Sequence, residues 1–258
     1  MVDIHCHILP GLDDGPDSLD MSLEMARVAV SEGITHVVAT PHSDNTFRFD
    51  PELVRHRRDE LQALLGSQLQ LATGCDFHLS FENLQDLRTH PHKYTINQKD
   101  FLLVEFANFA IPPSINETLH SLHLMQLWPI ITHPERNGLI LAKPEMLHGW
   151  VSRGCYVQVT AQSFLGRFGT GAQRFAETLL DHNCVHFVAS DAHNNGARPL
   201  RLRQAYEWVA KRSGEDVAHA LFRENPLAAY EGRSLPFVPD PPENAAALKS
   251  GRKRFFFF

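Results

Sequence analysis

Asp3-Ile4-His5-Cys6-His7 is the stretch that decides the fold, and a turn at residues 10–15 follows it. Side chains alternate between the two faces of an extended strand, so His5 and His7 are predicted to share one face while Ile4 and Cys6 share the other. Two imidazoles on one face are suited to a divalent metal. The stretch therefore predicts a strand whose end carries a metal site.

The turn that follows contains two adjacent carboxylates, Asp13 and Asp14. Because the turn lies just past the end of the predicted strand, either carboxylate can add a hard oxygen ligand to the same ion or to a neighbouring one. Asp14 can equally well cap the turn through hydrogen bonds to the backbone. In a chain with 16 histidines a single motif is weak evidence, so the site needs partners further along the sequence.

The rest of the chain repeats one pattern, an apolar run followed by a segment with helical spacing. A helix is predicted over residues 18–32, where apolar side chains recur at helical intervals and Gly33 marks the end. A second helix is predicted from Asp50-Pro51 to Gly66. Seven apolar runs have the length and composition of buried strands: residues 3–7, 34–40, 69–73, 101–104, 130–132, 155–160 and 186–190.

This alternation predicts an α/β fold, because parallel neighbours need a crossover connection. A distorted (β/α)7 TIM-like barrel fits best, since candidate ligands follow six of the seven runs and such barrels gather their sites at the C-terminal ends of the strands. A doubly wound open sheet, with its site at one switch point, is the alternative. We place the barrel in residues 1–233 and expect a disordered, proline-rich and basic tail over residues 234–258.

Nine side chains near the ends of these runs form the candidate metal-binding set: His5, His7, Asp14, His42, Asp76, Glu105, His133, Asp191 and His193. At about four to six ligands per ion, the set implies two or three divalent ions. Histidine and carboxylate without thiolate favour manganese first, with iron or zinc as alternatives. Taken singly, each residue has a structural explanation, but burying nine titratable groups together without cations would be strongly unfavourable.

The composition argues against several classes of protein. A formal net charge of -6 offers no basic field for a phosphate backbone, so nucleic acid is not an expected partner. No apolar run approaches the roughly 20 residues of a membrane span, and no signal peptide fits before the first motif. The four cysteines lie in apolar runs without close pairing, which is typical of a reducing compartment and makes the cytoplasm the expected location.

A phosphatase with a cysteine nucleophile is excluded as well. Such an enzyme needs an arginine six positions after its nucleophile, and the corresponding positions hold Leu12, Phe81, Ala161 and Ser190.

The motifs themselves resemble a known family, the PHP (polymerase and histidinol phosphatase) superfamily. Within it, the chain is most similar to the bacterial manganese-dependent tyrosine-protein phosphatases of capsule and exopolysaccharide loci, the CpsB/YwqE-like group. The resemblance runs over residues 1–231. It rests on the opening motif with Asp13-Asp14-Gly15, and on Thr40-Pro41-His42, Val104-Glu105-Phe106, His133-Pro134-Glu135-Arg136 and Ala189-Ser190-Asp191-Ala192-His193-Asn194.

That resemblance implies the PHP form of the barrel, a trinuclear metal centre, and hydrolysis of phosphotyrosine on the C-terminal tail of a bacterial tyrosine autokinase. It also implies that Arg136 and Arg198 bind the phosphoryl group, which suits the paired donors and fixed charge of a guanidinium. His42 is a candidate both as a metal ligand and as the acid that protonates the leaving phenolate. At Asp76 the family pattern has the longer glutamate, so two ions are an alternative to three.

Several other functions are compatible with the same residues. A PHP small-molecule phosphatase, acting on an ester such as histidinol phosphate, or a phosphodiesterase would have a similar metal site. A regulator that binds metal and the kinase without turnover is an alternative of another class, which the two arginines argue against. Phenylalanines near the ligand motifs can pack on a tyrosine ring or in the core: Phe47, Phe49, Phe106 and Phe109. The basic and aromatic residues 252–258 can make a weak membrane contact.

Overall fold

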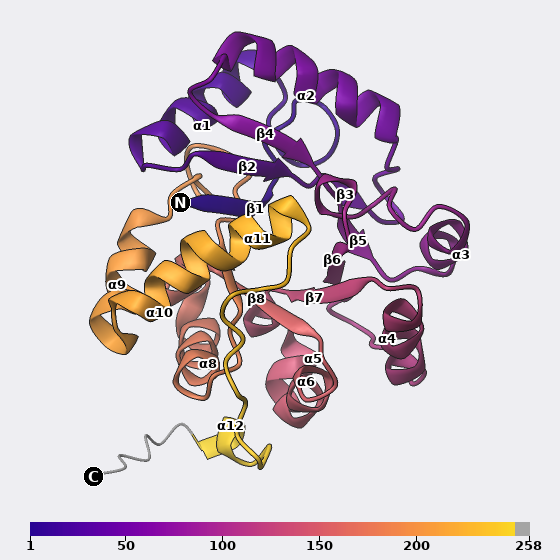
Figure 1. Cartoon of the computed structure of the whole chain (residues 1–258), viewed down its shortest axis with the longest axis vertical. Helices are drawn as coiled ribbons and strands as arrows, with labels where there is room; N and C mark the ends of the chain where they lie inside the picture. The colour runs from indigo at the N-terminus through magenta and orange to yellow at the C-terminus, as the bar shows by residue number, and fades with distance from the viewer. Residues whose placement is uncertain (251–258) are drawn as a thin grey trace.

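The strands lie at the centre of the molecule and helices surround them (Figure 1). The computed structural model describes residues 1–250, so the basic and aromatic residues 252–258 lie outside the described residues. Over residues 1–250 the strands form two parallel sheets, in the orders β1-β2-β4 and β3-β5-β6-β7-β8-β9. The predicted α/β class with parallel strands is confirmed. The strands are β1 (Val2–Cys6), β2 (His36–Ala39), β3 (His42–Ser43), β4 (Gln70–Thr73), β5 (Asp76–His78), β6 (Phe101–Glu105), β7 (Trp128–Thr132), β8 (Tyr156–Thr160) and β9 (Phe187–Ala189).

Helices and short helical turns connect the strands. Within the described residues none of the helices is long and apolar enough to cross a bilayer. The elements are α1 (Leu19–Ser31), α2 (Pro51–Leu65), α3 (Phe81–Thr89), η1 (Ile96–Gln98), α4 (Ile115–Leu124), η2 (Pro134–Arg136), α5 (Gly138–Ala142), α6 (Pro144–Val151), α7 (Ala161–Phe164), α8 (Gly169–Asp181), α9 (Arg203–Ser213), α10 (Glu215–His219), the π-helical η3 (Ala220–Glu224), α11 (Asn225–Glu231) and α12 (Ala247–Ser250).

The two helices predicted from sequence form as expected, because their ends are fixed by local hydrogen bonds. The Ser18 side chain accepts a hydrogen bond from the backbone N–H of Met21 at the start of α1. The Asp50 carboxylate caps α2 in the same way, with Pro51 in the first turn. Gly33 and Gly66 follow the two helices with positive φ angles of 79° and 56°, which lie in the region that glycine adopts without strain.

Two of the seven predicted strand positions are interrupted, which the apolar runs did not indicate. The run at residues 34–40 forms β2 and resumes after Pro41 as β3, while the run at residues 69–73 forms β4 and resumes after Gly74-Cys75 as β5. Pro41 has no N–H to donate to a neighbouring strand, so pairing is broken there. The short strands β3 and β5 pair in parallel with His42 opposite Asp76. The interruption therefore brings two candidate ligands into direct register.

The predicted alternation of faces in β1 is wrong at one position. Pairing with β2 places Val2 opposite His36 and Asp3 opposite Val37, but Cys6 opposite Ala39, so β1 has one extra residue between Asp3 and Cys6. A bulge of this kind resets which face each side chain occupies. Ile4 consequently belongs to the smaller of the two apolar clusters in the core, whereas Cys6 belongs to the larger one. His5 and His7 do lie together, as predicted, and their Nε2 atoms are 3.4 Å apart.

The strands bury two separate apolar clusters, one on each face. In β6, Leu102 and Val104 belong to the larger cluster that packs against the surrounding helices, and Phe101 and Leu103 belong to the smaller inner cluster. This is the alternation expected of strands that are covered on both faces. Ala228 of α11 also belongs to the inner cluster, and α11 crosses in front of β1 in Figure 1.

Part of the predicted tail has a described course along the protein. Asn225 in α11 exchanges hydrogen bonds with the backbone of Phe237, and the ring of His148 in α6 contacts the carbonyl oxygen of Pro242 at 2.5 Å. Leu235 and Leu248 are buried, Leu248 as part of the outer cluster. Residues 234–248 therefore pack against the helices, while the domain boundary at residue 233 stays a prediction.

A buried histidine directly before β9 is expected to make stability depend on pH. Burial lowers the pKa of His186 to about 3, and its Nδ1 accepts a hydrogen bond from the backbone N–H of Val157. The unfolded chain takes up this proton near the ordinary value of 6.5, so it binds more protons than the folded protein between pH 6.5 and 3. The free energy of unfolding should therefore decrease as the pH is lowered through this window, and this residue contributes at most about 1.4 kcal/mol per pH unit.

We expect His186→Asn, which keeps an acceptor, to show a shallower fall in the free energy of unfolding between pH 7 and 5 than the wild type. Urea unfolding of both proteins with excess chelator would measure the two slopes without a contribution from metal release. Equal slopes would show that the neutral imidazole of His186 does not contribute to the acid sensitivity.

Candidate metal centre

All nine candidate ligands lie in one cluster at one end of the strands. They belong to β1, β3, β5 and β6 and to the segments directly after β1, β7 and β9. Contacts of 3.2 to 3.7 Å between imidazole nitrogens and carboxylate oxygens connect them, through the pairs His5–Asp76, His5–Asp191, His7–Asp191, His42–Asp14, His42–Asp76, His42–Glu105, His133–Glu105, His193–Asp14 and His193–Asp191. The sequence prediction that these side chains meet is therefore supported by the geometry.

These spacings are those expected of ligands that share an ion. Metal bonds of about 2.0–2.2 Å at tetrahedral or octahedral angles separate adjacent ligand atoms by about 3.0–3.6 Å. In three groups the ligand atoms all lie within 4.8 Å of one another: His7, Asp14, His42 and His193; His5, His7 and Asp76; and His42, Asp76 and Glu105. Each pair of groups has one residue in common, namely His7, His42 or Asp76. The ligands can thus hold more than one ion at neighbouring positions.

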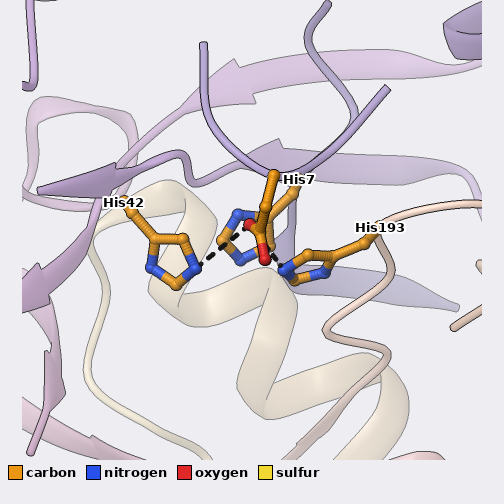
Figure 2. A group of neighbouring side chains, drawn as sticks. His7, His42 and His193 are labelled. Atoms are coloured by element: carbon orange, nitrogen blue, oxygen red, sulfur yellow. Dashed lines mark ion pairs between the residues drawn. The ribbon is translucent and has the colours of Figure 1, made fainter. Parts of the chain in front are cut away.

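Figure 2 shows how one of these groups is arranged. His42 and His193 approach from opposite sides, with His7 between them. The Nε2 atoms of His42 and His193 lie 3.4 and 3.2 Å from the same oxygen of Asp14, and these are the dashed contacts of the figure. Asp14 therefore lies where it can act as a ligand, and not only as a cap of its turn.

The fit of the residues to a metal is tested most directly by Asp76. This side chain has no exposed surface, yet neither of its carboxylate oxygens accepts a hydrogen bond within the described protein. Its Oδ2 faces His5 at 3.4 Å and His42 at 3.3 Å. A buried carboxylate without donors is costly unless a cation compensates it. Asp76 is therefore placed as a carboxylate between two ligand groups, although it is one methylene shorter than glutamate.

Two ligand histidines are oriented by partners on their other ring nitrogen. Nδ1 of His7 lies 2.6 Å from Asp13, and Nδ1 of His5 lies 2.9 Å from the side-chain oxygen of Gln158. Since each partner oxygen accepts a hydrogen bond from a protonated Nδ1, both histidines present an unprotonated Nε2 to the cluster. The sequence indicated Asp13 only as an alternative ligand and gave Gln158 no role. The only signal for Gln158 was a polar residue at an inward position of an apolar strand.

Two ligands are held in an uncommon backbone conformation. His133 has a φ angle of 32° and Asp191 one of 51°, in the left-handed region that non-glycine residues rarely occupy. The backbone around Asp191 is fixed by β1, because its N–H donates to the carbonyl oxygen of His5 and the N–H of His7 donates to Ala192. Backbone strain of this kind is typical of functional sites, where surrounding contacts compensate its cost.

The charges in the cluster are strongly coupled. Burial disfavours the charged form of His5, but the neighbouring carboxylates of Asp76 and Asp191 outweigh it and raise the pKa of His5 to about 9. Burial and the nearby charge of Asp76 raise the pKa of Glu105 to about 8. Carboxylates so close together repel one another unless cations lie between them. Divalent ions would remove this repulsion and keep the carboxylates of Asp76 and Glu105 ionised.

Two arginines border the cluster and share one carboxylate oxygen. Nη1 of Arg136 and Nη2 of Arg198 both donate to Oδ2 of Asp191, the second over 2.5 Å. Each arginine side chain is about a quarter exposed (24%), so its outer donors can reach a ligand. The guanidinium of Arg136 also lies over the ring of Phe168, 4.4 Å from its centre, a contact that the sequence did not indicate.

The four phenylalanines near the ligand motifs have different environments. Phe49 and Phe106 are buried in the outer cluster, which is the ordinary role expected of them. Phe47 stacks on the imidazole of His42, with 6.1 Å between ring centres. Phe109 is 86% exposed. Of the four rings, only that of Phe47 stacks on a candidate ligand within the described structure.

Comparison with known proteins identifies the family. Residues 1–231 match the family model for capsular polysaccharide synthesis, CpsB/CapC. The chain belongs to this family. The tyrosine-protein phosphatase YwqE of Bacillus subtilis is 34% identical over 262 residues, which cover the whole of both chains. The tyrosine-protein phosphatase CpsB of Streptococcus agalactiae is 29% identical over 238 residues, which cover 87% of this chain and 96% of that protein.

Solved structures of the CpsB/CapC family agree with the fold. A structure described as YwqE from Bacillus subtilis and CpsB from Streptococcus pneumoniae, unique metal-dependent tyrosine phosphatases, superimposes with a TM-score of 0.87 at 34% identity, over 95% of this chain and 100% of that one. A β-aspartyl dipeptidase of Fervidobacterium islandicum shares the fold alone, with a TM-score of 0.53 at 15% identity, over 93% of this chain and 75% of that one.

Asp76→Asn removes the charge of this buried carboxylate while keeping its volume. We expect metal binding to become weaker by about 100-fold or more, because even partners outside the ligand shell change metal affinity by about 10–100-fold. Metal content after dialysis, measured by inductively coupled plasma mass spectrometry, would test this. Asp86→Asn, at a carboxylate paired with Lys93 outside the cluster, is the matched control and should retain its metal. Unchanged metal content in Asp76→Asn would remove Asp76 from the ligand set.

Gly15 allows the turn that carries Asp13 and Asp14 to approach β1. A Cβ atom at this position would lie 2.6 Å from the backbone oxygen of His7, which is closer than real contacts permit. We expect Gly15→Ala to displace the turn and to weaken metal binding about tenfold or more, with secondary structure intact. Gly171→Ala, where a Cβ would meet nothing within 4 Å, is the control. Metal titration of both variants would decide, and wild-type affinity in Gly15→Ala would contradict the required close approach.

Proposed function

We propose that this chain is a metal-dependent tyrosine-protein phosphatase that hydrolyses phosphotyrosine in a protein substrate. One observation carries the proposal: in a member of the CpsB/CapC family, two arginines border a cluster of imidazoles and carboxylates, in which buried Asp76 has no hydrogen-bond donor among the described residues, and share one oxygen of its Asp191. Imidazole and carboxylate ligands suit ions that activate water, and arginines suit a phosphoryl group.

The proposed centre contains two or three divalent ions, with manganese preferred and iron or zinc as alternatives. Three ligand groups that pairwise share His7, His42 and Asp76 support up to three positions. When bound, the ions supply an activated water and neutralise charge on the phosphoryl oxygens. The ligands would be the nine residues predicted from the sequence. The choice of manganese rests on the donor set and on the family resemblance.

The chain's own residues bind and orient the phosphoryl group. Arg136 and Arg198 are held by Asp191, and their outer N–H groups are available to phosphoryl oxygens, where fixed positive charge stabilises the charge of the transition state. His42 faces carboxylates through both ring nitrogens, so we assign it to metal binding and not to protonation of the leaving group. Phenolate leaves readily, so the reaction has little need for a dedicated acid.

We further infer that the two sheets close into the distorted (β/α)7 barrel of the PHP fold. When β2 with β3 and β4 with β5 are each counted as one interrupted strand, seven strand positions follow in order. A parallel bridge between Cys6 and Ala192 joins β1 to the segment after β9. This bridge supports closure between the first and last strands, with the ligand cluster at the C-terminal ends.

The protein substrate we propose is the C-terminal tail of a bacterial tyrosine autokinase that regulates capsule or exopolysaccharide synthesis. The capsular description of the family supports this context. The cytoplasm is the proposed location, and four buried cysteines that form no disulfide are consistent with it. Weak membrane contact by residues 252–258 stays a prediction, as those residues lie outside the described structure.

A substrate comparison tests this function. After chelation and readdition of manganese, the protein should release phosphate from a tyrosine-phosphorylated peptide faster than from histidinol phosphate or a dinucleotide. Arg136→Ala should lower kcat/KM for the peptide by about 100-fold or more while bound metal is retained, because a charge-stabilising donor is lost. Arg174→Ala, at an exposed arginine of α8, is the control.

The outcomes of this comparison separate the rival functions. Preference for histidinol phosphate or for the dinucleotide would show that the protein is another kind of phosphoesterase and not a tyrosine phosphatase. Bound metal without turnover of any substrate would support a regulator in place of an enzyme.

A further inference from the structure

Phe168 lies at the edge of the metal centre, where the loop after α7 meets the turn that carries Arg136. Its half-buried ring lies under the guanidinium carbon of Arg136 at 4.4 Å from the ring centre. A cation within about 6 Å of an aromatic face is attracted by the negative face of the ring. Arg136 is therefore fixed in two ways, by the Asp191 carboxylate at Nη1 and by Phe168 on one face.

The loop that presents Phe168 is built by tight turns. Gly166 and Gly169 flank it with positive φ angles of 76° and 87°, and the N–H of Gly169 donates to the carbonyl oxygen of Gly166 over 3.1 Å. Gln173 in α8 braces this loop, since its amide donates to the carbonyl oxygen of Phe164. A Cβ at Gly166 would lie 3.0 Å from Oε1 of Gln173, so this side chain packs closely against the loop.

A second set of contacts joins η2, which carries Arg136, to α7, which precedes the loop of Phe168. Glu135, the neighbour of Arg136 in η2, is fully buried and accepts hydrogen bonds from the backbone N–H of Thr160 and from the hydroxyl of Ser163. The start of α7 is thus fixed to the turn that carries Arg136. Phe168 is five residues beyond Ser163, at the other end of this short segment, so its position over Arg136 is set by the fold.

We infer that Phe168 is a positioning residue for phosphoryl binding, which acts by holding the guanidinium of Arg136 in one plane. The stack restricts rotation of the guanidinium and leaves its outer N–H edge free for phosphoryl oxygens. No comparable ring lies over Arg198 within the described residues, so the device is specific to Arg136. This inference rests on the role of Arg136 in the proposed function.

A double-mutant cycle with inorganic phosphate as the probe tests this role in the metal-loaded protein. Phe168→Leu should weaken phosphate binding by about 3- to 30-fold, the range of a cation–π contact, and Phe168→Tyr should restore it. In the Arg136→Ala background, Phe168→Leu should change the dissociation constant less than about twofold, because the partner of the ring is already absent. Calorimetric titration measures the four proteins of the cycle and Phe168→Tyr. Bound metal and melting temperature, determined in parallel, show whether each variant is intact.

The cycle separates positioning from a general structural role. An equal loss with and without Arg136 would show that Phe168 acts elsewhere, and so would wild-type affinity in Phe168→Leu. Phe81→Leu, which removes a ring that is 71% exposed at the start of α3, is the matched control and should show no coupling to Arg136.

Failure of the proposed function is distinguished by combining this titration with the substrate comparison described above. If phosphate binding shows strong coupling of Phe168 to Arg136 but the protein hydrolyses no phosphotyrosine, the proposed phosphatase activity is refuted and the positioning role of Phe168 remains. A protein that hydrolyses phosphotyrosine without this coupling would refute only the role of Phe168.

Discussion

The carboxylate of Asp191 is the contact on which the rest of the site depends. Its Oδ1 faces His5, His7 and His193 at 3.5, 3.5 and 3.7 Å, and its Oδ2 accepts from the two arginines. One buried side chain therefore connects the proposed metal ligands to the proposed phosphoryl-binding groups. The imidazoles and the two neighbouring arginines outweigh the cost of burial and hold its pKa well below the usual range. Because Asp191 follows β9 and bonds to the backbone of β1, this contact also links the first and last strands.

The polar cluster lies next to an apolar core, and the same strands contribute residues to both. In β1 the extra residue lets Val2 and Ile4 enter the inner cluster while His5 and His7 reach the ligand groups. In β6, similarly, Leu103 belongs to the inner cluster and Glu105 belongs to a ligand group. The inward-facing side chains of β1 and β6 thus change from aliphatic residues to candidate ligands along the strand. Well-packed apolar neighbours limit the movement of the ligands, which must hold their geometry for the site to bind metal.

Much of this arrangement could be predicted from the sequence because its signals are local. Caps such as Ser18 and Asp50 act within their own helices, and a polar residue after an apolar run shows directly in the order of the chain. The bulge in β1 could not be predicted, since it arises from pairing with β2. Gln158 and Phe168 were missed for a similar reason. Their partners, His5 and Arg136, are distant in the sequence, and neither amide nor phenyl groups suggest metal or phosphoryl chemistry.

Asp76 shows how tertiary structure compensates for a shorter side chain. The family resemblance predicts glutamate here, and a side chain shorter by one methylene would ordinarily hold its carboxylate farther from both neighbouring imidazoles. The break before β5 removes this difficulty, because Asp76 starts a strand whose register places it directly opposite His42. The backbone brings the carboxylate to the cluster, and Oδ2 lies almost equally far from His5 and His42, at 3.4 and 3.3 Å. The shorter side chain also has fewer rotatable bonds, so less conformational entropy is lost when it is held without hydrogen bonds. The position of this carboxylate between His5 and His42 therefore depends on strand register more than on side-chain length.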